Sequence, residues 1–518
     1  MKRIAKSTHA SVGARLAFFL FAALPVVAQA AACGLQSSSS PAGAGPTLRF
    51  PAGAASVTAG SDLYGGSTLY NVDDDAFWND PTGIASLKAA GVRTLRFPGG
   101  GVADNWDWES NRLVRPDEWP KEARTEDERK GRTDYLEFLS AIKKTNVTDP
   151  FFVVNVDSAV RDEGDLDTNI QRYAQRAAAW VRAVKQAGYK VTYWEIGNEM
   201  YLPSNPVTAG EYARVLNAYS KAMKAADPSI KIGAVGPIEI DESGFGDKVG
   251  EEALKSIRAK ANTTGSKPCE GEKTRDCIRE FKKGKRQSRE EKWWPTVVSR
   301  ARDSFDFAVV HRYKLAKFPQ GGSGALPATE NIQVLKRTLS SAKGTNVPIA
   351  LTEWNIPGDL HRKRALPHID HLMHVGIYLG SNAVGGVDFA HYWPFRTNSK
   401  DFGTLLTKDG RLTPIGRLFE LTSPMIPNAP VAEAVLSPDV YALKIGGSTT
   451  RGALVVNMGT SPVNVQFADT AKGTSSLTRM VGDAEGNISE QPCETTQSAG
   501  GSAVVAAPGK SITVLRIQ

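Results

Sequence analysis

Short apolar, β-branched segments alternate with longer amphipathic segments over most of the chain between residues 60 and 425. The apolar segments have the length of strands that are buried on both faces. They cover residues 63–69, 92–97, 150–156, 191–196, 230–235, 305–311, 348–354 and 387–393. Between them, apolar residues recur at helical spacing, and in 168–188 these are Ile170, Tyr173, Ala177, Trp180, Val181 and Val184. Strands separated by helices indicate βα units in a parallel sheet. Eight units predict an α/β fold, a closed (β/α)8 TIM barrel, although an open doubly wound sheet would give a similar pattern.

Helical periodicity stops near residue 430, and short alternating apolar runs replace it. They cover residues 440–445, 452–457, 463–467 and 511–517. This pattern predicts a C-terminal β-sandwich over residues 426–518. Residues 47–59 are also strand-like, so we expect 31–59 to be a linker plus an N-terminal strand that joins the sandwich. The barrel then occupies residues 60–425, interrupted by a long polar insertion at 240–295.

The N-terminus has the features of an export signal. A leader with four basic residues precedes the apolar run Leu16–Val27, which ends at the small-residue site Ala28-Gln29-Ala30. We expect residues 1–30 to be a signal peptide and the mature protein to be secreted or periplasmic. The apolar run is shorter than the roughly 20 residues of a membrane-spanning helix, so we expect no stable membrane span. A retained anchor and a lipid anchor at Cys33, which follows a loosely lipoprotein-like site, are the alternatives.

Charge and cysteine content narrow the functional classes. The formal charge is +8, and removal of the four basic leader residues leaves +4, which is too small to indicate a nucleic-acid partner. The insertion contains the basic run 282–286, which could meet an acidic polysaccharide; a solvated surface loop is the competing interpretation. Cys269 and Cys277, also in the insertion, are the expected disulfide of an exported chain. A zinc site is the alternative there, but no His pair lies nearby to complete it.

Two glutamates stand at ends of predicted strands, where a barrel gathers its reactive groups. Glu199 ends the segment Tyr193-Trp194-Glu195-Ile196-Gly197-Asn198-Glu199. The amide of Asn198 can hydrogen-bond a sugar hydroxyl near the reacting carbon. Glu353 ends the seventh apolar segment, in Leu351-Thr352-Glu353-Trp354-Asn355. Taken singly, each has a structural interpretation: a carboxylate at a helix N-terminus for Glu199, and a surface residue for Glu353. Together they provide the two carboxylates that glycoside hydrolysis requires.

Four further side chains fall at strand ends beside this pair. His311 and Tyr313 face the same way from the sixth strand, so both should border Glu353. Arg96 at the end of the second strand can pair with Glu353, and the glycines that follow Arg96 allow a tight turn. Those glycines match no phosphate-binding pattern. Trp393, at the end of the eighth strand, offers an aromatic plane to a sugar ring, with core packing as the alternative.

These motifs resemble glycoside hydrolase clan A, whose families place the acid/base in an Asn-Glu pair after strand four and the nucleophile after strand seven. The segments Arg96–Gly100, Trp194–Met200 and Glu353–Asn355 look most like family 51 α-L-arabinofuranosidases, and parts of the pattern are shared with families 39, 44 and 79. The resemblance covers about residues 60–425. Two features depart from family 51: Leu63-Tyr64-Gly65-Gly66 stands where the family usually carries a Glu-His pair, and the basic insertion has no counterpart.

The resemblance and the residues together predict a secreted retaining glycoside hydrolase acting on a plant or microbial polysaccharide. Glu353 is the expected nucleophile and Glu199 the expected acid/base, while Arg96, Asn198, His311, Tyr313 and Trp393 are expected to bind substrate. We expect no metal or cofactor. We also expect burial and the charge of Glu353 to raise the pKa of Glu199, so that it can act as an acid.

An α-L-arabinofuranosidase-like activity is the first expectation for the substrate. A β-xylosidase, an endoglucanase and a β-glucuronidase of the same clan are the alternatives. A transglycosylase of an exported polysaccharide would use the same residues. An inactive carbohydrate-binding barrel is the remaining alternative, because a fold does not dictate its function.

Overall fold

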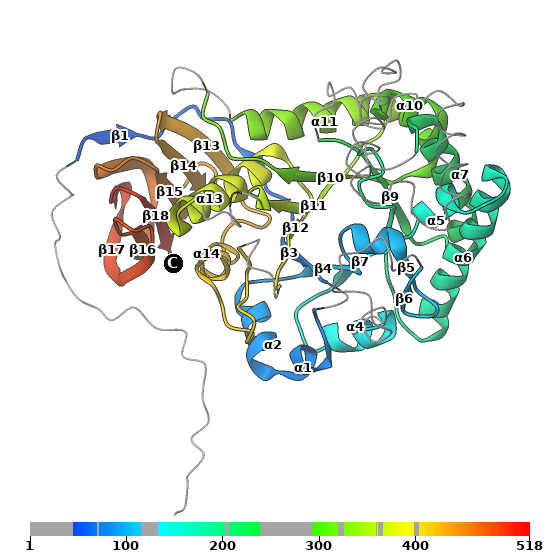
Figure 1. Ribbon diagram of the computed structural model, residues 1–518. Helices are drawn as coiled ribbons and strands as arrows, with labels where there is room; N and C mark the ends of the chain where they lie inside the picture. Colours follow the sequence, from blue (N-terminus) through cyan, green and yellow to red (C-terminus); the bar gives the residue numbers. More distant parts are fainter. Residues whose placement is uncertain are drawn as a thin grey trace, which may run out of the picture.

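The computed structural model describes residues 45–69, 72–114, 133–202, 207–238, 293–319, 326–358, 360, 366–397 and 403–518. Several predictions lie outside these residues: the signal peptide, the lipid anchor at Cys33, the insertion as far as residue 292, and the Cys269–Cys277 disulfide. A barrel surrounded by helices lies beside a curled sheet in Figure 1. Within the described residues, no helix is long and apolar enough to cross a membrane.

Eight parallel strands close into a barrel in the order β10-β11-β12-β3-β4-β7-β8-β9. They are β3 (Asp62–Ser67), β4 (Thr94–Phe97), β7 (Asp149–Val154), β8 (Tyr193–Ile196), β9 (Lys231–Val235), β10 (Phe307–Tyr313), β11 (Ile349–Asn355) and β12 (Phe389–Tyr392). Each overlaps one of the eight predicted segments. The closed ring confirms the TIM barrel and excludes the open doubly wound sheet.

Helices cover the outside of this barrel, most of them in the crossovers between its strands. They are α1 (Asp75–Asn79), α2 (Pro81–Ala89), α4 (Tyr135–Ile142), α5 (Asp157–Arg161), α6 (Leu166–Gln186), α7 (Ala209–Ala226), α10 (Trp293–Ala301), α11 (Pro327–Lys343), α13 (His368–Gly385) and α14 (Pro414–Thr422). Short elements complete the loops: η1 (Gly101–Asn105), η4 (Arg302–Ser304), and the hairpin β5 (Trp106–Asp107) and β6 (Arg112–Leu113). Helix α6 lies within two residues of the predicted 168–188, and Asp165 caps its N-terminus, where the Asp165 side chain accepts a hydrogen bond from the Thr168 amide.

The barrel interior is layered, as side-chain alternation along its strands requires. An aromatic layer lies low in the barrel, where Phe151 stacks on Tyr193 with ring centroids 4.6 Å apart and Phe307 and Phe389 pack edge-on against Phe151. Glu195 lies two residues beyond Tyr193 on the same strand, and it belongs to a polar layer above the aromatic one. Since the aromatic layer fills the barrel beneath it, the polar layer faces the C-terminal ends of the strands.

The C-terminal body is one eight-stranded sheet that folds over on itself, in the order β1-β16-β18-β15-β14-β13-β2, with β17 beside β16. Its strands are β1 (Thr47–Arg49), β2 (Val57–Thr58), β13 (Pro430–Ser437), β14 (Val440–Ile445), β15 (Gly452–Asn457), β16 (Val463–Gly482), β17 (Ile488–Ala507) and β18 (Ser511–Ile517). The first part of β16 pairs with β1 and its last part pairs with β18, so β16 passes from one layer to the other. A separate apolar core, which includes Val455, Val465 and Phe467, fills the space between the layers.

Strand β17 is the part of this sheet that the sequence pattern did not predict. Its segment is rich in Ser, Thr, Gln and Gly, and it lacks the alternating apolar residues by which a half-buried strand is recognised. The prediction for β16 likewise stopped at residue 467, just before the register shift between Ala468 and Thr470. Pairing with a neighbouring strand, rather than side-chain burial, therefore extends these two strands to 20 residues each.

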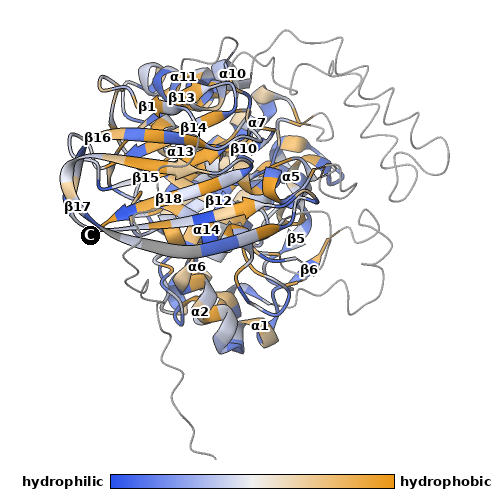
Figure 2. Cartoon of the chain, turned by 90° about the vertical axis from the view of Figure 1, so that its left-hand side faces the viewer, coloured by the Kyte–Doolittle hydropathy of each residue, from blue (hydrophilic) through white to orange (hydrophobic). Residues whose placement is uncertain are grey.

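Helix α13 joins the barrel to the sheet. Most of its residues are buried on all sides, as expected for a helix between two packed layers. Glycines 376 and 380 face the sheet, where Ile512 and the Tyr441 hydroxyl come so close that a Cβ at Gly380 would lie 1.9 Å from the hydroxyl oxygen. Figure 2 shows α13 behind the strands of the sheet. The core is continuous across this contact, so the sheet supports the helix that follows β11.

Candidate active site

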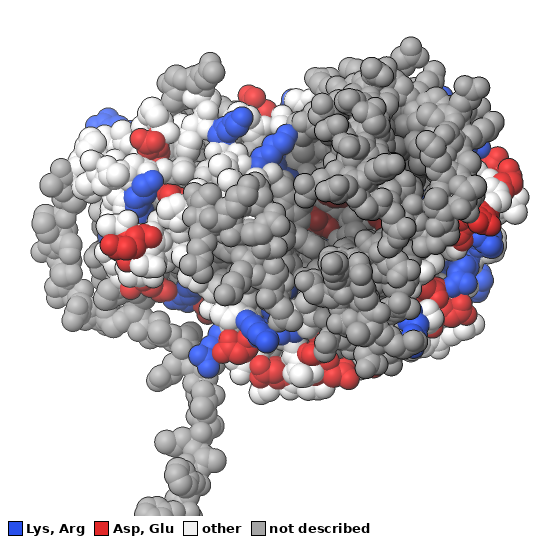
Figure 3. Space-filling model, viewed as in Figure 1, with Lys and Arg blue, Asp and Glu red and all other residues white. Residues whose placement is uncertain are grey.

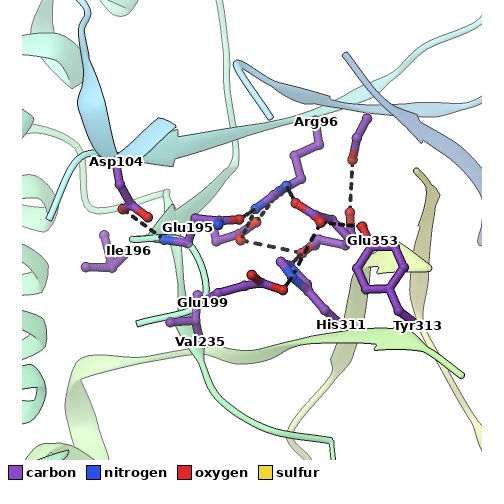
Figure 4. A network of polar contacts seen from close by, with 12 residues as sticks. Arg96, Asp104, Glu195, Ile196, Glu199, Val235, His311, Tyr313 and Glu353 are labelled. Atoms are coloured by element: carbon purple, nitrogen blue, oxygen red, sulfur yellow. Dashed lines mark hydrogen bonds and ion pairs between the residues drawn. The ribbon is translucent and has the colours of Figure 1, made fainter. Parts of the chain in front are cut away.

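A buried arginine is the centre of the polar layer. Arg96 on β4 is 0% exposed and donates four hydrogen bonds (Figure 4). Its Nε and Nη2 bind the Glu195 carboxylate at 2.9 and 2.6 Å, Nη2 also binds Asn198 Oδ1 at 2.8 Å, and Nη1 binds Glu353 Oε1 at 2.6 Å. Burial by itself would lower the pKa of Arg96, but the charges and hydrogen bonds of Glu195 and Glu353 outweigh it and raise that pKa. The guanidinium therefore stays charged and fixes side chains from β8 and β11.

Glu353 on β11 is held at both carboxylate oxygens. Oε1 accepts from Arg96, and Oε2 accepts from the Tyr313 hydroxyl at 2.5 Å. Burial, followed by the negative charges of Glu353 and Glu199, raises the pKa of Tyr313 well above its usual value, so the hydroxyl keeps its proton and donates. Only 5% of the Glu353 side chain is exposed. Hydrogen bonds at both oxygens hold the carboxylate in a fixed orientation.

Glu199 faces a histidine instead. His311 Nδ1 lies 2.9 Å from Glu199 Oε1 and 3.7 Å from Glu353 Oε2. On the other side of the ring, Nε2 lies 3.0 Å from Thr352 Oγ1, and this hydroxyl donates to Glu195 at 3.4 Å. A hydroxyl that donates its only hydrogen to a carboxylate must accept from the histidine, so Nε2 carries a proton. Nδ1 is then the nitrogen that exchanges a proton with Glu199.

The backbone at Glu199 adopts a left-handed conformation that residues other than glycine rarely take. Its φ is +47°, and Gly197 two residues earlier has φ +78°. A left-handed residue with a Cβ costs about 1–2 kcal/mol, so the surrounding structure must hold it. The Tyr212 hydroxyl from α7 donates to the Ile196 carbonyl at 2.8 Å, and the Leu202 amide donates to the Glu199 carbonyl at 2.8 Å. This turn directs the Glu199 carboxyl towards His311 (Figure 4).

The two candidate catalytic carboxyls lie close together. One oxygen of Glu199, one oxygen of Glu353 and the His311 nitrogen all lie within 4.8 Å of one another. Such a set of two carboxylates and an imidazole could also hold a metal ion, but both oxygens of Glu353 already accept hydrogen bonds from protein groups. In the space-filling view, acidic atoms are visible at the bottom of a hollow in the middle of the molecule (Figure 3).

Trp393 borders the site from the end of β12. The indole packs over the turn after β4, since a Cβ at Gly100 would lie 2.4 Å from the ring. Asn355 fixes the tryptophan backbone by donating to its carbonyl at 2.6 Å. The amide oxygen of Asn355 is in turn 2.9 Å from Nε2 of His371 on α13. Trp393 is half-buried.

The structure brings six of the seven predicted residues into direct contact: Glu199, Glu353, Arg96, Asn198, His311 and Tyr313. Glu195 and Thr352 lie in the predicted motifs, but no role was predicted for them. Asp104 was not predicted as a site residue. Glu195 had a usable signal, because a glutamate in a buried strand needs a cation, and Arg96 lies in another buried strand. Asp104 had none, since it follows a glycine-rich turn whose path the sequence does not fix.

One expectation about Glu199 is wrong for the protein without substrate. Burial does favour a raised pKa, but the hydrogen bond and charge of His311, followed by the charge of Arg96, outweigh it and lower the pKa of Glu199. Burial opposes the charged form of His311 too, but Glu353 and Glu199 together raise its pKa. The proton of this pair therefore resides mainly on His311, because the imidazole lies between the two carboxylates.

Replacement of Arg96 tests whether this centre also stabilises the fold. Arg96→Met leaves Glu195 and Glu353 buried without their cation, and we expect the free energy of unfolding to fall by about 3–5 kcal/mol. The matched control is Arg411→Met, because the side chains of Arg411 and Asp409 are 75% and 60% exposed and lie 3.2 Å apart, an exposed pair worth less than about 1 kcal/mol. Denaturant unfolding measures both variants. Equal losses would contradict a structural role for Arg96.

Part of the chain is similar to arabinofuranosidases. The model of the α-L-arabinofuranosidase 1 domain matches residues 86–256. "Probable alpha-L-arabinofuranosidase C" of Aspergillus fumigatus is 25% identical over 196 residues, which cover 33% of this chain and 35% of the relative. "Intracellular exo-alpha-(1->5)-L-arabinofuranosidase 1" of Bacillus subtilis is 32% identical over 179 residues, 32% of this chain and 33% of the relative. The chain thus matches about a third of the length of these relatives, and the intracellular one fits the predicted export poorly.

Solved structures share the fold over nearly the whole chain. A family 51 α-L-arabinofuranosidase from Bifidobacterium longum is 15% identical, with a TM-score of 0.59 over 91% of this chain and 99% of that one. A family 39 glycoside hydrolase from Bacteroides cellulosilyticus is 13% identical, with a TM-score of 0.56 over 89% and 81%. A family 44 xyloglucanase from Paenibacillus polymyxa is 12% identical, with a TM-score of 0.51 over 91% and 99%. The domain match and the shared fold together show that this chain resembles the glycoside hydrolases of clan A, and that within the clan it is like family 51.

Proposed function

We propose that this chain is a retaining glycoside hydrolase with Glu353 as nucleophile and Glu199 as acid/base. The observation that carries the proposal is the spacing of the two carboxyls, whose nearest oxygens lie within 4.8 Å. Retaining enzymes hold their carboxyls about 5–5.5 Å apart, whereas inverting enzymes separate them by about 6.5–9.5 Å to admit a water molecule. The short spacing supports direct attack by a carboxylate on the sugar.

The reaction then proceeds in two displacements. Glu353 attacks the anomeric carbon while Glu199 gives a proton to the departing glycosidic oxygen, and a glycosyl-enzyme ester forms. Water enters, Glu199 removes its proton, and attack on the anomeric carbon releases the sugar and frees Glu353. Asn198 accepts from Arg96 through its amide oxygen, so its amide nitrogen is the group that can donate to a sugar hydroxyl.

His311 explains how an acid with a lowered pKa can still deliver a proton. Glu199 and His311 share one proton across the 2.9 Å contact, in addition to the proton on Nε2. A move from Nδ1 to Oε1 makes Glu199 the acid, and the pair titrates as a unit. When Glu353 becomes an ester it loses its charge, so the cationic form of His311 loses a stabilising neighbour.

An α-L-arabinofuranoside of a plant or microbial polysaccharide is the proposed substrate, supported by the domain match and by the names of the relatives. The sequence of strand β3 differs from the usual family 51 pattern. The segment Leu63-Tyr64-Gly65-Gly66 stands where that family usually carries a Glu-His pair, and a Cβ at Gly66 would lie 2.6 Å from Phe395. A panel of aryl arabinosides, xylosides, glucosides and glucuronides separates the proposed sugar from the β-xylosidase, endoglucanase and β-glucuronidase alternatives. Product analysis with an added sugar acceptor separates hydrolysis from transglycosylation. Export remains part of the proposal, based on the N-terminal leader.

The roles of the two glutamates are tested by alanine variants rescued with azide. Glu199→Ala should lower turnover of an activated aryl α-L-arabinofuranoside about 10²–10⁴-fold, because water must then attack the glycosyl-enzyme without a base. Azide should restore it and give a glycosyl azide with the configuration of the substrate, because azide attacks the glycosyl-enzyme. For Glu353→Ala, azide should replace the nucleophile and give the opposite configuration. Glu109→Ala, with a side chain 65% exposed, is the control for removal of a surface glutamate. Wild-type turnover in either active-site variant would refute the assignment.

The proton shared with His311 sets the alkaline limit of activity. The pKa of His311 is raised above its usual 6.5, so the proton is kept as the pH rises through 6.5 and is lost only at the higher folded value. We expect kcat/KM to stay level through pH 6.5 and to fall with an apparent pKa above it. A pH profile on one aryl substrate measures this limb. A midpoint at or below 6.5 would show that His311 does not hold the proton.

A further inference from the structure

The strained turn that carries Glu199 depends on an acidic residue from another strand. Asp104 lies on η1, which follows the Gly99-Gly100 turn after β4. In the ring of strands, β7 separates β4 from β8, so η1 has to cross the end of β7 to reach the Glu199 turn. There Asp104 Oδ1 accepts a hydrogen bond from the Asn198 amide at 3.1 Å (Figure 4).

With this contact, each residue of the turn from Ile196 to Glu199 is held by a hydrogen bond. Ile196 is held at its carbonyl by Tyr212, Gly197 donates to the Val154 carbonyl, and Glu199 accepts from the Leu202 amide. Asn198 is held twice, by Arg96 at its side chain and by Asp104 at its amide. Both groups that hold Asn198 come from the segment that begins at β4. Asn198 immediately precedes Glu199, whose φ of +47° has to be maintained by its surroundings.

We propose that Asp104 is a positioning residue for the acid/base: by accepting the Asn198 amide, it holds the strained backbone that aims the Glu199 carboxyl. Asp104 is buried and has no hydrogen bond to Glu199 or Glu353, so it acts through the peptide that joins Gly197 to Asn198, one residue before Glu199. Burial and the charge of Asp157 raise the pKa of Asp104 well above its usual value, and a protonated carboxyl still accepts through its carbonyl oxygen. An asparagine amide oxygen can serve in the same way.

Loss of the Asp104 contact should impair proton donation by Glu199 and leave the attack by Glu353 intact. Misplacement of a catalytic group by about 1 Å can cost about 10²-fold in rate. Loss of a well-placed acid slows the cleavage of a poor leaving group strongly and of a good leaving group little, because a good one departs without a proton. Damage to the nucleophile, or to the fold, would slow both.

The experiment compares kcat/KM for phenyl and 2,4-dinitrophenyl α-L-arabinofuranosides, and it rests on the proposed function. Asp104→Ala should lower kcat/KM for the phenyl glycoside by about 10²-fold and for the dinitrophenyl glycoside by less than about 3-fold. Asp104→Asn should stay within about 3-fold of wild type on both, because the acceptor is retained. Asp73→Ala is the control, since it removes another buried carboxyl, paired with Arg396 at 3.1 Å, and should change both substrates by one factor.

Each outcome decides the inference. Equal losses on both substrates in Asp104→Ala, or an Asp104→Asn variant as impaired as Asp104→Ala, would overturn it. If Asp104→Ala does not fold, Asp104→Glu, which keeps a carboxyl but displaces the acceptor, should show the same selective loss. Hydrogen exchange of the peptide spanning residues 196–202 gives a readout without substrate, and faster exchange in Asp104→Ala but not in Asp104→Asn is expected. An inactive wild-type enzyme with that exchange pattern would refute the proposed function while leaving the backbone contact intact; an unchanged exchange rate in both variants would refute the contact itself.

Discussion

A single buried guanidinium organises the whole polar layer of this barrel. A charge that is removed from water is tolerated only when partners surround it, and Arg96 meets this requirement with four hydrogen bonds to Glu195, Asn198 and Glu353. These partners come from β8, its following turn and β11, so the requirement of one side chain fixes the relative positions of three parts of the chain. The aromatic layer beneath makes the surroundings apolar, which strengthens each of these contacts.

The same centre makes the two carboxyls chemically unequal. Glu353 receives hydrogen bonds at both oxygens and is held almost completely buried. Glu199 has 23% of its side chain exposed and faces an imidazole with which it can exchange a proton. This difference arises from their neighbours rather than from the residues themselves, and it suits the proposed roles of Glu353 in attack and Glu199 in proton transfer. Glu195, a third carboxylate in the layer, accepts from Arg96 at both oxygens and from Thr352, and it stabilises the charged arginine that binds Glu353.

Much of this arrangement could be predicted from the sequence, for physical reasons. Strands buried on both faces give continuous apolar runs, which located all eight barrel strands, and parallel strands end on one face, which located Glu199, Glu353, His311 and Tyr313. The lowered pKa of Glu199 could not be predicted, because alternation tells which way His311 points but not that its ring lies between two carboxylates. Asp104 was missed because a glycine-rich turn carries it across the end of a neighbouring strand. Strand β17 was missed because strand pairing rather than burial extends it, and pairing leaves no apolar pattern.

The proposed retaining mechanism depends on the short spacing of the two carboxyls, which bring an oxygen each within 4.8 Å, because this spacing favours direct attack by Glu353 over attack by an intervening water molecule. The most direct measurement is proton NMR of the wild-type reaction on an aryl α-L-arabinofuranoside, recorded before the released sugar mutarotates. For a retaining mechanism, we expect the first sugar to appear to have the anomeric configuration of the substrate. Initial release of the opposite anomer would contradict it.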